Sequence, residues 1–306
     1  ADEFVQKLAA AMKSTRYGDP LADESVEYGP LINEAGFRKV SGLVERAVTA
    51  GAGPTVACLH SSGSSSAQWR RLIESRQAAH RFIAFDFHGH GRSPEFAGHS
   101  YALRFESEAV SDGLPPSREP IHLVGHSYGG AVALDLAVRY PGRFASVTVF
   151  EPVLFALLDP VSAEFAEITS TGLAIVRAAR AGELRAAAAT FIDYWNGSGA
   201  WRAIPVEQQE RVCARIVPVA RHFEALFANP LPFDRLRALR VPTLVLLGDR
   251  SPAPARAVSE CLGALPFVTV ESLPGVGHMG PITHPEEVNA RIARHLRDSS
   301  TLPIAA

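Results

Sequence analysis

From residue 54 to the C-terminus, short apolar runs alternate with stretches of helical spacing. Residues 128–139 form one such stretch, and the last one begins near Pro285. Strands that alternate with helices form parallel sheets with helices on both faces. The pattern therefore predicts an α/β core with a mostly parallel sheet, built from residues 54–154 and 237–306. Its predicted strands are 55–59, 82–85, 121–124, 147–150, 243–247 and 268–270.

Residues 155–236 interrupt this alternation. They contain no good strand and are rich in Ala, Glu and Arg at helical spacing, which predicts a helical cap inserted over the sheet. Its aromatic side chains have two interpretations: they form the core of the cap, or some of them line a ligand pocket. They are Phe191, Tyr194, Trp195, Trp201, Phe223 and Phe227.

Residues 1–53 follow a different pattern. They are charged, and Phe4, Val5, Leu8 and Met12 fit one face of a helix. A second amphipathic run covers about 34–50, before two glycines. This segment is therefore predicted to be a helical N-terminal appendage.

Composition narrows the possible partners and the cellular location. The 306 residues carry a formal net charge of −2, and no run of Lys and Arg suggests a nucleic-acid or anionic-membrane partner. No apolar run is long enough to span a membrane. Near the N-terminus, charged residues stand where a signal peptide would have its apolar core. Cys58, Cys213 and Cys261 are far apart in sequence, which favours small buried side chains over a disulfide framework or a zinc site. A soluble cytoplasmic protein without a metal is expected.

Ser127 is the first candidate for chemistry. It occupies the centre of Gly125-x-Ser127-x-Gly129, between a predicted strand and a predicted helix. A serine nucleophile needs a base, a group that orients the base, and donors for the developing oxyanion. The strand–turn–helix context favours a nucleophile over an ordinary tight turn.

Several motifs accompany this turn in a fixed order: LHSSG at 59–63, DFHGHGRS at 86–93, GHSYG at 125–129, GDRSP at 248–252 and GVGHM at 275–279. With them, residues 54–298 resemble a serine esterase of the α/β-hydrolase family with a lid. The resemblance implies that His278 is the catalytic base and that the backbone N–H groups of Ser62 and Tyr128 form the oxyanion hole. The family usually has His-Gly where this chain has His60-Ser61.

The acid of the triad has two candidates. Many relatives carry it three residues after the glycine that ends the penultimate strand, which is Ser251 here, and Asp249 lies only one residue after that glycine. In a minority of the fold, including some haloalkane dehalogenases, the acid ends the strand after the nucleophile. Glu151 occupies that position, and we expect it to be the acid, with Asp249 as the alternative. Asp86 is interpreted as a residue that fixes its own loop.

Residues 1–53 contain three short motifs, GDPL at 18–21, GPLIN at 29–33 and VERAV at 44–48. With these motifs, the segment resembles a short piece of an aldehyde dehydrogenase. The piece has no cysteine and is too short for a nucleotide-binding domain, so no dehydrogenase activity is predicted. A gene fusion or a chimera is expected. The segment then packs as an appendage, replaces the β-hairpin with which the family normally opens, or mediates self-association.

The leading functional prediction is a carboxylesterase that uses Ser127, His278 and an acid on a small-molecule ester, without a cofactor. A C–C bond hydrolase or a thioesterase on the same fold would use the same groups. A catalytically inactive binding or scaffold protein is the alternative from another class. Ser127 argues against dehalogenase or epoxide hydrolase chemistry, which on this fold resembles that of enzymes with an aspartate nucleophile.

Overall fold

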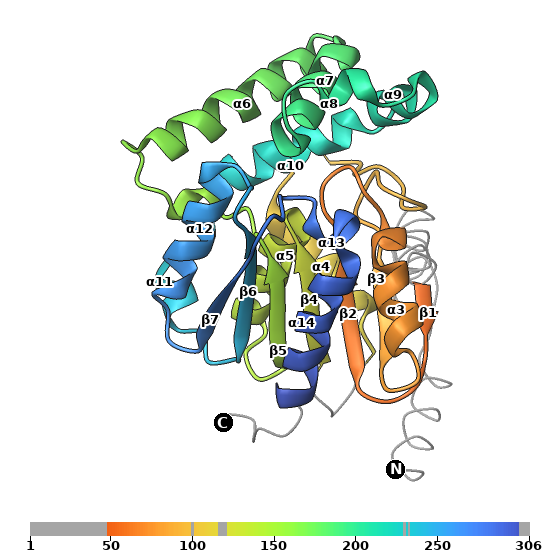
Figure 1. Ribbon diagram of the computed structural model, residues 1–306, viewed down its shortest axis with the longest axis vertical. Coiled ribbons are helices and arrows are strands. Elements are labelled where there is room, and N and C mark those ends of the chain that lie inside the picture. Colours follow the sequence, from red (N-terminus) through yellow and green to blue (C-terminus); the bar gives the residue numbers. More distant parts are fainter. Residues whose placement is uncertain (1–47, 99–100, 116–120, 229–230, 232, 300–306) are drawn as a thin grey trace, which may run out of the picture. The chain divides into compact units, whose positions relative to one another are not determined.

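The computed structural model describes residues 48–98, 101–115, 121–228, 231 and 233–299. In these ranges a seven-stranded sheet has the order β1-β3-β2-β4-β5-β6-β7 (Figure 1). β1 is antiparallel to β3, and the other neighbouring strands are parallel. The six predicted strands and the mostly parallel sheet are confirmed. The strands are β1 (Val48–Ala50), β2 (Thr55–Leu59), β3 (Arg81–Phe85), β4 (Ile121–His126), β5 (Phe144–Phe150), β6 (Thr243–Gly248) and β7 (Val268–Leu273).

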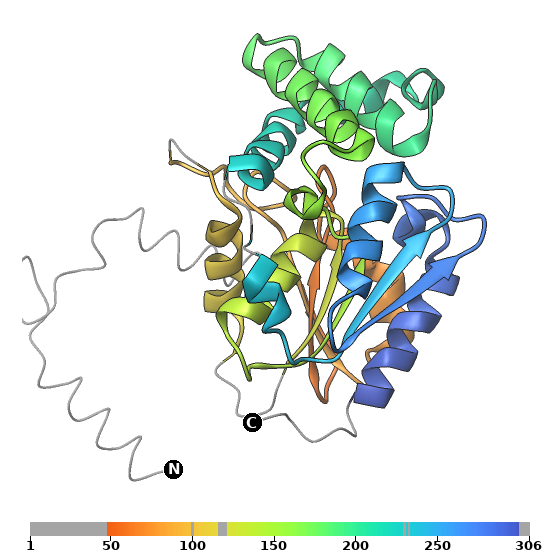
Figure 2. The same cartoon turned by 90° about the vertical axis from the view of Figure 1, so that its left-hand side faces the viewer.

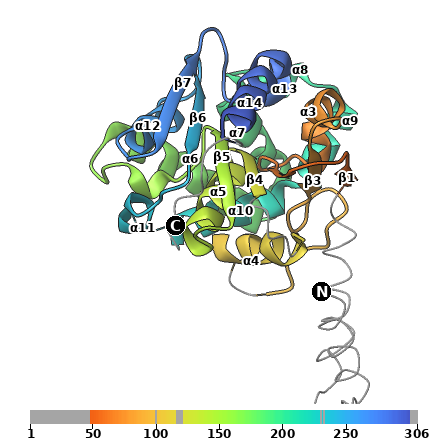
Figure 3. The same cartoon turned by 90° about the horizontal axis from the view of Figure 1, so that it is seen from below.

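Helices cover both faces of the sheet because its strands are apolar on both sides. In β2, Val56 and Cys58 belong to one apolar cluster, whereas Ala57 and Leu59 belong to the other. Figure 3 shows α3 and α14 on the face opposite α4 and α5. None of the helices in the described ranges is long and apolar enough to cross a membrane. The first face carries α3 (Arg70–Arg76) and α14 (Pro285–Ser299), and the second carries α4 (Leu103–Gly113), α5 (Tyr128–Arg139), α11 (Phe233–Arg237) and α12 (Ala253–Gly263).

A set of helices between β5 and β6 lies over one end of the sheet (Figures 1 and 2). It is the carboxyl end, because Trp195 on α7 contacts His278 in the loop after β7. The stretch predicted to be a helical insertion thus contains helices and no strand among its described residues. These cap helices are α6 (Ala163–Arg180), α7 (Leu184–Asn196), α8 (Ala200–Ala203), α9 (Val206–Cys213) and α10 (Ile216–Ala228).

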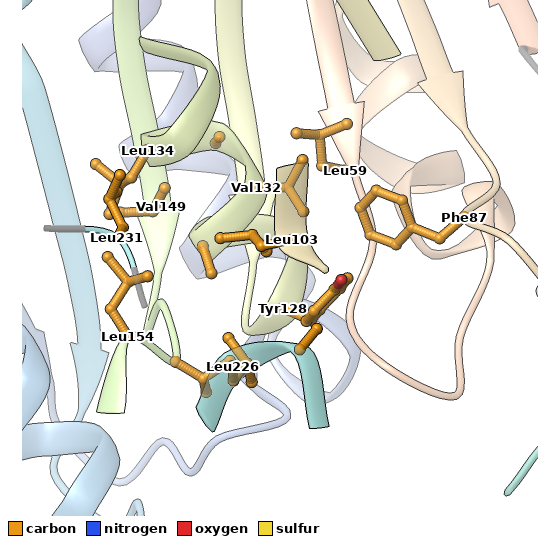
Figure 4. Packing of buried hydrophobic residues seen from close by; sticks show 14 of the residues in the cluster. Leu59, Phe87, Leu103, Tyr128, Val132, Leu134, Val149, Leu154, Leu226 and Leu231 are labelled. Carbon is orange, nitrogen blue, oxygen red and sulfur yellow. The ribbon is translucent and has the colours of Figure 1, made fainter. Parts of the chain in front are cut away.

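The apolar core continues from the sheet into the cap. Figure 4 shows Leu226 of α10 in the same cluster as Tyr128 and Val132 of α5 and Leu59 of β2. All four side chains are buried. Because burial of apolar surface stabilises both parts at once, the cap is held on the sheet by packing as well as by its covalent connections.

The predicted N-terminal appendage lies mostly outside the described residues. Its described end corrects the prediction, because Val48–Ala50 form strand β1 instead of the last turn of a helix. Thr49 pairs with Ile83 and Ala50 with Phe82. A strand of three residues has no periodicity of its own to read from the sequence, and it forms here because the edge of β3 offers unpaired backbone groups.

Candidate active site

Ser127 lies in the turn between β4 and α5. Its φ of 55° and ψ of −117° place the backbone in a region that residues with a side chain rarely adopt. Hydrogen bonds hold this conformation: the Ser127 N–H donates to Phe150 O over 2.9 Å, and Ser127 O accepts from the Ala131 N–H over 3.1 Å. The turn therefore presents Ser127 at the carboxyl end of the central strand.

The glycines on either side of Ser127 are required by close packing. A Cβ atom on Gly125 would lie 2.4 Å from Gly129 O. One on Gly129 would lie 2.3 Å from Leu59 O and 2.5 Å from His60 O. These neighbours are backbone atoms, which cannot rotate away as a side chain could.

Gly129→Ala is expected to lower the free energy of unfolding by roughly 1 to 3 kcal/mol, because β2 and α5 must separate to admit the methyl group. Denaturant unfolding followed by circular dichroism measures this change. Gly277→Ala is the matched control, since its new Cβ would meet only Arg250 O, at 3.9 Å. It should change the same quantity by no more than roughly 0.5 kcal/mol. Equal losses in the two variants would contradict the packing explanation.

Ser127, His278 and Glu151 come together beyond the ends of β4, β7 and β5. Nε2 of His278 lies 3.0 Å from Oγ of Ser127, and Nδ1 of His278 lies 2.6 Å from Oε2 of Glu151. All three side chains are buried. The carboxylate accepts from Nδ1–H, which leaves Nε2 as the acceptor that faces the serine hydroxyl. This arrangement suits transfer of the serine proton to the imidazole.

Hydrogen bonds compensate for the burial of the Glu151 carboxylate. Its Oε1 accepts from the Gly248 N–H over 2.7 Å and from the Ser251 hydroxyl over 2.5 Å. Together with His278, three donors therefore reach one fully buried carboxylate, as the burial of such a group requires. Its φ of 44° turns the side chain out of the strand direction at the end of β5.

The structure separates the two candidate acids. Oδ1 of Asp249 accepts from the Gly275 N–H over 2.7 Å in an exposed turn, while Nδ1 of His278 is bonded to Glu151. Ser251, at the position where many relatives have their acid, donates its hydroxyl to Glu151. The geometry thus favours Glu151 as the group that orients His278, and Asp249 shapes the loop that leads to this histidine.

Ser62 and Tyr128 offer free backbone donors. In the part of the chain that the structure describes, neither N–H has a hydrogen-bond acceptor. Tyr128 is the first residue of α5, so its N–H also carries the positive end of the helix dipole. Such unpaired donors beside a nucleophile suit the negative oxygen of a tetrahedral intermediate.

Two neutral histidines hold the loop that contains Ser62. The Phe87 N–H donates to Nε2 of His60, and the Gly63 N–H donates to Nε2 of His90, each over 3.0 Å. Burial is the main cause that lowers the pKa of both side chains, to about 3 in His60. Both rings therefore remain acceptors at neutral pH, and the loop is fixed although Ser61 replaces the usual glycine.

A polar network that the sequence did not reveal connects this loop with the base. The Ser61 N–H and hydroxyl both donate to Oε1 of Gln68, over 3.1 and 3.0 Å. Because that amide oxygen accepts, the amide nitrogen donates to Nδ1 of His126, over 3.1 Å, and Nε2–H of His126 donates to His278 O, over 2.8 Å. Burial is the main cause that holds the pKa of His126 well below its usual range, and the neighbouring imidazole of His278 acts in the same direction. No sequence pattern joins residues 68 and 126.

The cap contributes an aromatic side chain to the site. The indole of Trp195 stacks on the imidazole of His278, with ring centroids 3.9 Å apart and an interplanar angle of 27°. Phe223 and Phe227 instead pack over Gly172 in the cap itself, where a Cβ atom would lie 2.8 and 2.7 Å from them. Some of the cap aromatics thus form the cap's own core, and Trp195 contacts His278. That some of them line a ligand pocket stays a prediction.

Comparison with known proteins covers almost the whole chain. Residues 56–291 match the model of the Alpha/beta hydrolase family. Residues 1–67 match the model of the Aldehyde dehydrogenase family, which confirms the N-terminal resemblance and extends it past residue 53.

Individual relatives are named as hydrolases and esterases. A protein of Variovorax paradoxus (strain S110), named as a carbamate hydrolase RutD, is 31% identical over 233 residues, 72% of this chain and 83% of its own length. The pimeloyl-[acyl-carrier protein] methyl ester esterase of Aeromonas salmonicida is 34% identical over 110 residues, 36% of this chain and 42% of that protein. The solved structure of a thermophilic esterase from Thermogutta terrifontis is 25% identical with a TM-score of 0.65, and the match covers 83% of this chain and 93% of that one.

Proposed function

The chain belongs to the alpha/beta hydrolase family, and from this premise we propose that it is a serine hydrolase that cleaves carboxylic esters through an acyl-enzyme intermediate. The observation that carries the proposal is the pair of hydrogen bonds from Ser127 through His278 to Glu151, at 3.0 and 2.6 Å. The names of two similar proteins, a methyl ester esterase and a thermophilic esterase, support the same class of substrate.

Each step of the proposed reaction uses protein groups and water. Oγ of Ser127 attacks the ester carbonyl while Nε2 of His278 takes the hydroxyl proton. The N–H groups of Ser62 and Tyr128 stabilise the oxyanion, and His278 then gives its proton to the leaving alcohol as the C–O bond breaks. A water molecule, deprotonated by His278, attacks the acyl-enzyme and releases the acid. Glu151 keeps the imidazole in the productive tautomer throughout.

Carbamate hydrolysis is a second candidate, favoured by the name of the relative from Variovorax paradoxus, whose match covers 72% of this chain. A carbamate presents a carbonyl to the same nucleophile, so the same groups would act on it. Parallel assays with p-nitrophenyl butyrate and with the p-nitrophenyl ester of a carbamic acid distinguish the two activities. The substrate with the higher kcat/KM indicates which activity the site is built for.

Labelling with a fluorophosphonate tests the proposed function directly, because the reagent needs an activated serine. We expect one phosphonyl adduct per chain, located by mass spectrometry on the peptide that contains Ser127. The His278→Gln variant and heat-denatured protein should remain unlabelled. An unlabelled native protein would contradict the proposal and favour an inactive binding protein, and an adduct on another residue would contradict the assignment of Ser127.

A further inference from the structure

His222, on the cap helix α10, contacts both residues that would form the oxyanion hole. Its Nδ1 lies 2.8 Å from Oγ of Ser62. Its ring stacks on the phenol ring of Tyr128, with centroids 3.6 Å apart and an interplanar angle of 3°. The ring of His90, which accepts from the Gly63 N–H, also stacks on the His222 ring, with centroids 4.8 Å apart. One cap residue thus reaches the two elements of the core that supply the proposed oxyanion donors.

The surroundings of His222 restrict its charge and its tautomer. The side chain is 1% exposed, and burial, with the neighbouring His90, His60 and His88 opposing a further positive charge, holds its pKa well below the usual range. The ring is therefore neutral, with one donor and one acceptor. Nε2 is buried and has no hydrogen-bond partner among the described residues. Orphaned buried N–H groups are rarer in proteins than under-used acceptors, so the hydrogen belongs on Nδ1.

This tautomer decides what Ser62 can do. When Nδ1–H donates to Oγ of Ser62, the hydroxyl hydrogen of Ser62 is not used in that bond. The hydroxyl can then donate to a substrate oxygen, beside the backbone N–H of the same residue. The opposite tautomer would consume the hydroxyl hydrogen in the bond to His222 and leave a buried N–H unpaired.

We propose that His222 is a positioning residue for the oxyanion hole, which fixes Ser62 by a hydrogen bond, frees the Ser62 hydroxyl as a third oxyanion donor, and packs the start of α5 through Tyr128. This inference rests on the proposed function and adds the cap to the groups that stabilise the transition state. A cap that served as a cover alone would need no such bond to the core.

Variants at position 222 separate the hydrogen bond from the stacking. His222→Phe keeps an aromatic ring and removes the bond, His222→Asn places an amide near Nδ1, and His222→Gln places its amide nearer Nε2. Ser62→Ala removes the partner hydroxyl and keeps the backbone N–H. The chain also offers a control with the same kind of bond, because Nδ1 of His122 lies 2.8 Å from Oγ of Ser146 in a buried pair on β4, away from the site.

With p-nitrophenyl butyrate, Ser62→Ala and His222→Phe should each lower kcat by about 10- to 100-fold and change KM by less than about threefold, because an oxyanion donor acts in the transition state. The double variant should be no more than about twofold slower than Ser62→Ala, since His222 acts through Ser62. His222→Asn should recover most of the loss and His222→Gln should not. His122→Phe should keep kcat within about twofold of wild type, with its cost confined to stability.

Losses that multiply in the double variant, or equal kcat in His222→Phe and His122→Phe, would overturn the inference. The rate of fluorophosphonate labelling is measured in the same variants, because it requires no ester turnover. A wild type that is neither labelled nor active would overturn the proposed function and this inference with it. A reactive wild type whose His222 variants are labelled at the wild-type rate would overturn the inference alone. If His222→Phe does not fold, kcat and the labelling rate are compared between His222→Asn and His222→Gln instead. Equal values in these two variants would then overturn the inference.

Discussion

Ser127→Ala is expected to lower kcat for p-nitrophenyl butyrate by roughly 10⁴- to 10⁶-fold, the largest loss that any single replacement in this chain should produce. Without Oγ no acyl-enzyme can form, and the remaining groups can only polarise the ester for attack by water. The oxyanion donors stay in place, so a small rate above the uncatalysed one should persist. Initial rates with wild type and variant at equal concentration measure the effect.

The fold should survive this replacement, because the hydrogen bond from Ser127 Oγ that the structure records goes to His278 and not to the scaffold. Equal melting temperatures of variant and wild type verify that point. Ser259→Ala is a suitable control: this serine is buried on α12, where its hydroxyl donates to Ala255 O, and its loss should leave kcat within about twofold. Full activity of Ser127→Ala would show that another group is the nucleophile.

The fold could be predicted from sequence because its signals are local. Strands such as β2 and β6 are buried on both faces and therefore appear as unbroken apolar runs, and α5 was predicted with its observed limits of Tyr128 and Arg139. β1 was missed because three residues that pair with β3 carry no pattern of their own. The periodicity of apolar residues reveals a helix or strand when that element buries its own apolar side chains. It does not reveal an element that is stabilised mainly by pairing with a neighbour.

The site divides in the same way. Ser127 and His278 belong to sequence motifs from which their positions in the fold could be predicted, and the structure brings the two side chains together. Other polar contacts around the site join distant segments: Gln68 bonds to His126 across 58 residues, and His222 bonds to Ser62 across 160. These polar contacts depend on the packing of the cap and of two loops, and a single sequence contains no record of such packing.

The choice of acid was open for a related physical reason. Glu151, Asp249 and Ser251 all follow the carboxyl ends of strands, so each could face the same crevice. What separates them is the direction of each side chain, which follows from the positive φ of Glu151 and from the N–H groups of Gly248 and Gly275 that hold the two carboxylates. Backbone conformation of this kind is a property of the folded chain.

Glu151→Gln should therefore lower kcat by roughly 10³- to 10⁴-fold, whereas Asp249→Asn should change it by less than about threefold. A glutamine amide that donates to Nδ1 of His278 forces the hydrogen onto Nε2, so the ring can no longer accept the proton of Ser127. Asp249 holds only the Gly275 turn through Oδ1, and an asparagine oxygen can accept the same N–H. Rates with p-nitrophenyl butyrate and melting temperatures are compared for both variants.

Ser251→Ala completes this comparison, because it removes one of the three donors to Glu151 without touching His278. An intermediate loss of about tenfold is expected, since a carboxylate with an unpaired lone pair is less firmly fixed in its buried position. A large loss in Asp249→Asn together with a small one in Glu151→Gln would reverse the assignment of the acid. Large losses in both would mean that the loop from Asp249 to His278 must hold its shape for Glu151 to orient the base.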